Sequence, residues 1–236
     1  MNTFYEQNDP DDISDADKNK FVNEFEIEHG LFTWYDHENE INLLRKYNGG
    51  DSHIVIPEGI DAIGADVFCG CENLTGIEFP KSLKTIGDRA FLGCKNLKEI
   101  LLPDDLETIW YDAFSGCESL TGIAVPNSVR AICNNAFAGC ENLTDIKLSD
   151  NLSAVWEGVF YGCTNIQTIV IPKNVKLISD GAFCGCESLK SIEIPAGLET
   201  IGDYAFLGCK SLKKIIIPEN VEIGYKAFED TWVAKV

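Results

Sequence analysis

"LTGIEFPKSLKTIGDRAFLGC" occupies residues 74–94, and close relatives of this stretch recur down most of the 236-residue chain. Most copies carry Ala-Phe, one variable residue and then Gly-Cys. Isoleucine keeps an unbroken spacing of 23 residues, at positions 54, 77, 100, 123, 146, 169, 192 and 215. Phenylalanine keeps the same spacing from 68 to 206, and cysteine keeps it from 71 to 209. A fixed period of this length indicates a repeat architecture.

The first half of each unit, as in "LTGIEFP", alternates apolar and exposed residues, which is the period of a half-buried β-strand. Proline then ends the strand because it has no amide hydrogen to donate. The following "IGDRAF" is too short for an α-helix and favours a 3₁₀ turn or a brief helical turn. One unit cannot bury its own apolar face, so the units must stack. Parallel strands about 4.8 Å apart would give eight rungs a length of roughly 40 Å.

The unit L-x-x-I-x-[IFLV]-P-x-x-[LVI]-x-x-[IV]-x-x-x-[AV]-F-x-G-C-x-x resembles the BspA-like class of leucine-rich repeat, over residues 54–230. The resemblance implies a leucine-rich repeat solenoid, a right-handed curved coil of about eight repeats. It also implies a short parallel concave β-sheet, with 3₁₀ or short helical turns on the convex side. Proteins of this class are commonly bacterial cell-surface or secreted binding and adhesion proteins. The N-terminus has neither a basic n-region nor an apolar h-region, which by itself predicts a cytoplasmic protein.

The repeat pattern divides the chain into four regions. Residues 1–20 are polar and acidic, and we expect them to be disordered. Residues 21–53 are predicted to form a β-rich N-terminal cap, with one strand pair in "FEIEHGLFTWY" and another that turns at Asn48-Gly49-Gly50. The solenoid covers residues 54–230, with repeats starting at 54, 77, 100, 123, 146, 169, 192 and 215. Residues 231–236 are a C-terminal cap or tail, in which we expect Trp232 to plug the last rung.

The chain is strongly acidic, with a formal net charge of −19 and a pI of about 4.4. Such a surface repels phosphate backbones and anionic lipids, so nucleic acid is not an expected partner. No run of residues approaches the roughly 18 apolar residues needed to span a bilayer, so we do not expect membrane insertion either.

Seven of the ten cysteines share one position of the repeat, close to the phenylalanine. A disulfide needs two Cβ atoms that converge to roughly 3.8 Å, whereas neighbouring rungs hold side chains parallel at about 4.8 Å. Zinc needs four ligands that converge on one point, and a column spreads them along a line. The pattern therefore favours a column of small buried thiols, with no metal or other cofactor. Cys69, Cys133 and Cys184 lie outside this column.

No catalytic motif is recognisable, so we do not expect the chain to be an enzyme. It holds no G-x-S-x-G motif, Walker loop or Rossmann fingerprint. Histidine occurs at 29, 37 and 53. A metal site could be drawn from His37 with nearby glutamates, or from His53 with Asp51, but neither set has a recognised ligand spacing.

The variable positions of the repeat are where a solenoid stores binding specificity, because the fixed positions form the core. On the strand, the outward position between two core residues is the first candidate partner-binding column, with Leu101, Ala124, Lys147, Val170, Glu193 and Ile216. Several of these residues are apolar, which favours a shallow binding surface with an apolar centre. The alternative is that aliphatic residues here only reflect strand propensity.

A second candidate set is aromatic. Trp110 and Trp156 occupy a position that is glycine in several other repeats, and Tyr111 and Tyr161 lie close to them in the unit. Exposed aromatic residues are typical anchors for proteins or sugars. The alternative is a packing compensation within irregular repeats, since the fifth repeat also replaces its proline with Ser149.

These observations together predict a non-enzymatic protein-interaction or adhesion scaffold that recognises a protein partner through exposed repeat surfaces. A glycan is the alternative ligand, because aromatic residues also bind sugars. Self-association of sheets or strand edges into an oligomer is a structural alternative.

Overall fold

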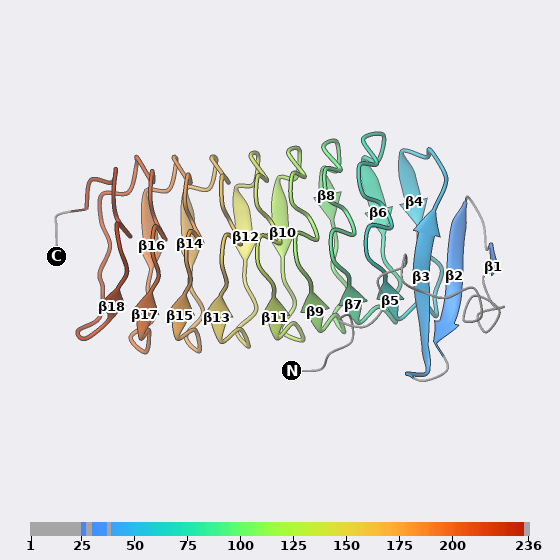
Figure 1. Cartoon of the computed structure of the whole chain (residues 1–236), viewed down its shortest axis with the longest axis horizontal. Helices are drawn as coiled ribbons and strands as arrows, with labels where there is room; N and C mark the ends of the chain where they lie inside the picture. The colour runs from blue at the N-terminus through green and yellow to red at the C-terminus, as the bar shows by residue number, and fades with distance from the viewer. Residues whose placement is uncertain (1–24, 27–29, 37–38, 234–236) are drawn as a thin grey trace, which may run out of the picture.

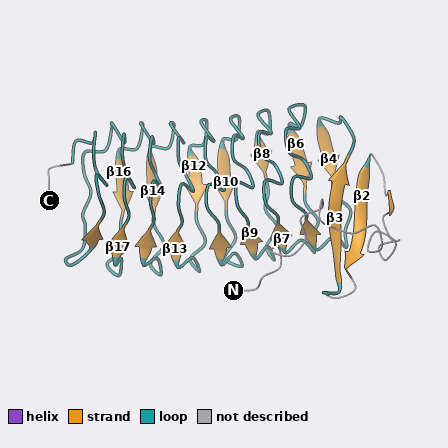
Figure 2. Ribbon diagram, in the orientation of Figure 1, coloured by secondary structure: helices purple, strands orange, loops and turns teal. Residues whose placement is uncertain are grey.

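The computed structural model describes residues 25–26, 30–36 and 39–233. These residues form a β-solenoid of about eight turns, and each turn of the coil is one rung (Figures 1 and 2). The repeat architecture expected from the sequence is therefore confirmed. The acidic segment 1–20 falls outside the described residues.

Each rung carries two short strands. The first strands pair in parallel and form what we call the first ladder: β4 (His53–Val55), β6 (Gly76–Glu78), β8 (Glu99–Ile100), β10 (Gly122–Ala124), β12 (Asp145–Lys147), β14 (Thr168–Val170) and β16 (Ser191–Glu193). The second strands form the second ladder: β5 (Ala62–Ile63), β7 (Thr85–Ile86), β9 (Thr108–Ile109), β11 (Ala131–Ile132), β13 (Ala154–Val155), β15 (Leu177–Ile178), β17 (Thr200–Ile201) and β18 (Glu222–Ile223). In Figure 1 the first ladder runs along the upper part of the solenoid and the second along the lower part.

Side-chain alternation explains both strands. In the first ladder Ile77 points into the core and is 5% exposed, whereas the next residue, Glu78, is exposed. In the second ladder Ile86 is fully buried and Thr85 is half-buried. The inward residues of both ladders belong to one hydrophobic core. The outward residues of the two ladders therefore lie on different parts of the perimeter, and those of the second ladder are less exposed, since Ala62 and Ala154 are buried.

The segment between the second strand and the next rung contains no helix, so the expected 3₁₀ or short helical turns are wrong. Separate turns fill it instead, such as the one closed by the bond from Cys94 N to Phe91 O at 3.1 Å. Arg89 (φ 51°) and Gly93 (φ 69°) are left-handed, which a right-handed helix cannot include. The turns still pair rung with rung, since Phe91 N donates to Ala113 O at 2.8 Å. The described part of the chain has no helix able to cross a membrane.

One phenylalanine from each rung stacks on the next along the solenoid. Neighbouring ring centroids lie 5.0–6.0 Å apart, and their planes differ by at most 16°. The rings from Phe68 to Phe206 are fully buried, and the half-buried Phe228 ends the stack. Tyr47 meets the first ring at 5.2 Å. Parallel, offset rings at this separation attract one another beyond the area they bury.

Both ladders are interrupted at the fifth rung. The second ladder divides between β11 and β13, and the first divides between β12 and β14. The widest step of the phenylalanine stack, 6.0 Å, lies between Phe137 and Phe160. Here the buried Ser149 replaces proline, and its hydroxyl donates to Val129 O at 2.7 Å. The fifth rung is therefore paired with the fourth through β12 and with the sixth through β13.

A small antiparallel sheet covers the N-terminal end of the second ladder. Its middle strand β2 (Leu31–Asp36) pairs with β1 (Phe25–Glu26) and with β3 (Ile41–Tyr47), and β3 pairs in parallel with β5. The strand pair predicted in "FEIEHGLFTWY" is confirmed. The pair predicted to turn at Asn48-Gly49-Gly50 is wrong, because β3 and β4 enter different ladders. The fully buried Leu44 places β3 opposite Ile63 as a core strand.

Trp232 does not plug the last rung, because it is 73% exposed. Its backbone N–H donates to Leu212 O at 3.0 Å, and the hydroxyl of Thr231 donates to Phe228 O at 2.7 Å. Phe228 already occupies the core position of this rung, so the indole is left outside.

Replacing Phe137 with alanine should lower the free energy of unfolding by about 3–5 kcal/mol, because the cavity would lie in the middle of a closed stack. Chemical denaturation followed by circular dichroism measures this loss. Tyr161→Ala is the control, since Tyr161 is exposed and its removal should cost much less. A loss at Phe137 no larger than the loss at Tyr161 would contradict the role given to the stack.

The interrupted second ladder should be visible in amide hydrogen exchange. Trp110 N donates to Ile86 O at 3.0 Å within the continuous part of the ladder. Trp156 holds the same position two rungs later, immediately after the break between β11 and β13. We expect the amide of Trp156 to exchange at least about tenfold faster than that of Trp110, because local opening there breaks no strand pairing to the preceding rung. Equal protection would show that the ladder is continuous in solution.

Candidate functional site

The first ladder presents the strand-face column, which comprises Val55, Glu78, Leu101, Ala124, Lys147, Val170, Glu193 and Ile216. Every member is exposed. The apolar members are the unusual ones, because Leu101 is 82% exposed, Val170 59% and Ile216 74%. Parallel pairing aligns Val55 with Glu78 and Ala124 with Lys147, and it aligns Val170 with Glu193 beyond the break between β12 and β14. The six strand candidates of the sequence analysis are therefore all exposed at one position of the repeat, in two groups on either side of that break.

At the N-terminal end of this row, a hydrogen-bonded pair crosses two rungs. His53 Nε2 lies 3.0 Å from Glu78 Oε1, and both side chains are more than half exposed. The imidazole covers Gly76, where an added Cβ would come within 2.8 Å of His53 Nδ1. The pair is therefore a surface contact at one end of the row. Among the described residues, no group of histidine, cysteine, aspartate or glutamate side chains is arranged to hold a metal ion.

The aromatic candidates form a separate surface, which we call the aromatic patch: Trp110, Tyr111, Trp156 and Tyr161. Trp110 and Trp156 directly follow the inward residues of β9 and β13, so they share the outward side of the second ladder. The Trp110 and Tyr111 rings are 6.0 Å apart and tilted by 49°. Tyr111 is 45% exposed, Trp156 39% and Tyr161 54%. The sequence candidates therefore belong to two surfaces on different parts of the perimeter.

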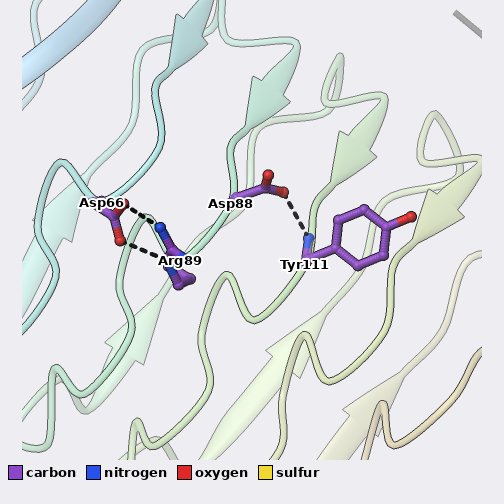
Figure 3. Close-up of polar contacts among 4 residues, drawn as sticks. All are labelled: Asp66, Asp88, Arg89 and Tyr111. Carbon is purple, nitrogen blue, oxygen red and sulfur yellow. Dashed lines mark hydrogen bonds and ion pairs between the residues drawn. The ribbon is translucent and has the colours of Figure 1, made fainter. Parts of the chain in front are cut away.

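A polar cluster that the sequence analysis did not single out lies beside the aromatic patch (Figure 3). Asp66 accepts two hydrogen bonds from the Arg89 guanidinium, at 2.8 and 2.6 Å. Asp88 accepts the backbone N–H of Tyr111 at 3.2 Å. Burial raises the pKa of the Asp88 carboxyl, and burial likewise raises the pKa of Asp112. Opposite charges exactly one repeat apart, Asp66 and Arg89, were the sequence signal for this cluster.

The cysteine column is a packing element. Six thiols, from Cys94 to Cys209, are fully buried, and each donates to the carbonyl oxygen of a phenylalanine one rung earlier at 3.0–3.3 Å. Burial raises the pKa of Cys94 and of Cys209 to about 12. All ten cysteines are free, and Cys71 at the start of the column is half-buried. A thiol with so high a pKa is neutral and unreactive at physiological pH.

A solvent-open depression of about 450 Å³ lies between the last two rungs. Its lining residues are Ala196, Gly197, Leu198, Glu199, Thr200, Glu219, Asn220 and Glu222. None of the candidate residues of either surface borders it, and none of its lining residues is a histidine, cysteine or serine.

The repeat is that of a known family. The sequence profile described as the BspA type leucine rich repeat region matches residues 47–155 and 107–235, in six copies. This chain belongs to the BspA-type leucine-rich repeat family. Repeats of this family generally serve as protein-interaction scaffolds. No curated protein sequence matches the chain significantly.

Solved structures of bacterial leucine-rich repeat proteins are similar to this one. A leucine-rich repeat protein of T. pallidum is 27% identical with a TM-score of 0.76, over 84% of this chain and 99% of that one. One from Bacteroides ovatus is 28% identical with a TM-score of 0.63, over 88% of this chain and 63% of that one. A leucine rich cell surface protein of Faecalibacterium prausnitzii is 27% identical with a TM-score of 0.61, over 87% of this chain and 52% of that one.

The buried thiols should make the protein sensitive to alkali. Their pKa values are raised above the ordinary value of 9.0, so the folded protein holds its thiol protons to higher pH than the unfolded chain. This contribution to stability is fully present below about pH 9 and is lost as the pH rises towards 12. Cys140→Ala should weaken the pH dependence of the unfolding free energy in that range, whereas Cys184→Ala, at a half-buried position, should change it less. Identical pH profiles for wild type and Cys140→Ala would contradict this account.

Proposed function

We propose that this chain is a non-enzymatic scaffold that binds a partner protein through the strand-face column. The observation that carries the proposal is the row of exposed apolar side chains, in which Leu101, Val170 and Ile216 are each more than half exposed. Isolated exposed leucines are ordinary, but these three recur at one position of the repeat, Val170 within β14 and the other two just outside the paired strands. A contact surface of this kind supplies binding energy when a partner covers it.

Strand pairing beneath much of the row favours affinity. Neighbouring outward residues are fixed by strand pairing on one side and by the buried residue beneath them, such as Ile169 under Val170. A surface that is already ordered loses little conformational entropy when it binds. The charged members Lys147 and Glu193 lie between apolar ones, and they would set the orientation of the partner more than its affinity.

Membership of a family of interaction scaffolds supports the non-enzymatic part of the proposal. So does the chemistry of the column of thiols, which burial keeps neutral. The similar Faecalibacterium prausnitzii structure is of a leucine rich cell surface protein, which makes adhesion at a bacterial surface the setting that we propose for this chain as well.

The double variant Leu101→Asp/Val170→Asp should lose its partner. Burying one aliphatic side chain contributes about 1.5–3 kcal/mol, so removing two should weaken binding by roughly one hundredfold or more. The protein is first used to capture partners from bacterial or host lysate, and the captured protein is then purified and titrated by calorimetry. Because both residues are exposed, the variant should keep the circular dichroism spectrum of the wild type.

Ile223→Asp is the matched control, because Ile223 is a 42% exposed aliphatic residue of the second ladder. It should bind the purified partner as the wild type does. Binding that survives the double variant would overturn the proposal. A smaller mass of the double variant in light scattering would instead assign the strand-face column to self-association.

A further inference from the structure

In most rungs the position directly after the second strand is a small residue, and Gly64, Gly87 and Gly202 are buried there. We call it the indole column: Gly64, Gly87, Trp110, Cys133, Trp156, Ser179, Gly202 and Gly224. An added Cβ at Gly87 would come within 2.7 Å of Ile63 O, and one at Gly202 within 2.7 Å of Asp180 N. Glycine there lets neighbouring rungs approach closely. The fold therefore does not call for an indole in this column, yet it carries two.

The two indoles lie two repeats apart. Trp110 and Trp156 are separated by one rung, which carries Cys133 in this column and Ala131 beside it. The rungs are 5.4 and 6.0 Å apart across this interval, measured between the ring centroids of Phe114, Phe137 and Phe160. Small residues between two tryptophans leave an interval that a flat ligand lying along the solenoid can bridge.

A row of hydrogen-bonding side chains follows the indole column by one residue: Asp88, Tyr111, Asn134, Glu157 and Asp180. Hydrogen bonds between neighbouring rungs orient four of these side chains, those of Asp88, Asn134, Glu157 and Asp180. Asp88 accepts the N–H of Tyr111, and Glu157 accepts the amide of Asn134 at 3.3 Å. A carboxylate can accept several hydrogen bonds, so these carboxylates can also accept hydrogen bonds from the hydroxyls of a ligand.

We propose that the indole column and this polar row form a binding site for a neutral, β-linked oligosaccharide that lies along the solenoid axis. The axial C–H faces of a pyranose ring stack on an indole, and its equatorial hydroxyls need oriented acceptors at the edge, which the polar row supplies. One sugar of an extended β-linked chain is about as long as one rung, so Trp110 and Trp156 contact alternate sugars. This site is on a different part of the perimeter from the strand-face column and does not depend on the function proposed for it.

Charge narrows the ligand to neutral sugars. The protein carries a net charge of −19, and the polar row itself includes Asp88, Glu157 and Asp180. An oligosaccharide of uronic or sialic acids would meet like charge at each rung. Nucleic acid, which also stacks on aromatic residues, is disfavoured for the same reason.

The test is a titration of the whole 236-residue protein with two neutral hexasaccharides, β-1,4-linked glucose and β-1,4-linked N-acetylglucosamine, followed by calorimetry and tryptophan fluorescence. At least one should bind saturably, with a Kd below about 1 mM. Trp110→Gly and Trp156→Gly should each weaken this binding by about tenfold or more, since each removes one stacking surface. Both variants restore the residue that other rungs carry in this column, so the backbone should fold as before.

Trp232→Gly is the matched control, because it removes an exposed indole outside the site and should leave the Kd unchanged. Trp110→Tyr keeps an aromatic ring and should retain most of the affinity, which separates loss of stacking from loss of fold. The proposal is overturned if neither hexasaccharide binds below about 10 mM, or if the Trp110→Gly/Trp156→Gly protein binds as well as the wild type. Tighter binding of a polygalacturonate hexasaccharide would also overturn the proposal. Loss of a protein partner in the Trp110→Gly/Trp156→Gly protein would overturn it as well.

Discussion

Contact between equivalent side chains on successive rungs is the interaction on which the solenoid depends. A phenylalanine ring lies on the ring before it at 5.0–6.0 Å, and a thiol from the same rung donates to the carbonyl oxygen of the phenylalanine one rung earlier. Both contacts require every rung to repeat the same register. Because an isolated rung has neither neighbour, its short strands gain their stability only within the array.

This dependence decides where function can reside. Residues that face inward are consumed by contacts that barely vary from rung to rung, so variation is concentrated on outward positions. Two rows at variable positions carry apolar or aromatic side chains where polar or small ones would be expected. These are the strand-face column with Leu101 and Val170, and the indole column with Trp110 and Trp156. They lie on different ladders. The two sites that we propose would let one chain engage two ligands of different chemistry at once.

The 23-residue period was sufficient to predict the solenoid, the first ladder and the buried thiols, because all three follow from side chains that recur in step. The period did not predict the second ladder or the turns, because local backbone geometry determines both. Thr85-Ile86 is too short to show a strand period, and the left-handed Arg89 stops a helix without a glycine to signal it. All of the sequence candidates proved exposed except the half-buried Trp110. The cluster of Asp66, Arg89 and Asp88 depends on contacts between rungs that no single repeat reveals.

The shared fifth rung has a mechanical consequence. Its first strand, β12, pairs with the rungs before it, and its second strand, β13, pairs with the rungs after it. Neither ladder is therefore continuous through the fifth rung. Tension applied to the two ends of the molecule would concentrate on the turns and side chains around Phe160, where fewer backbone bonds share the load. The solenoid would then extend by separation of the rungs around Phe160, while the rungs on either side stayed folded.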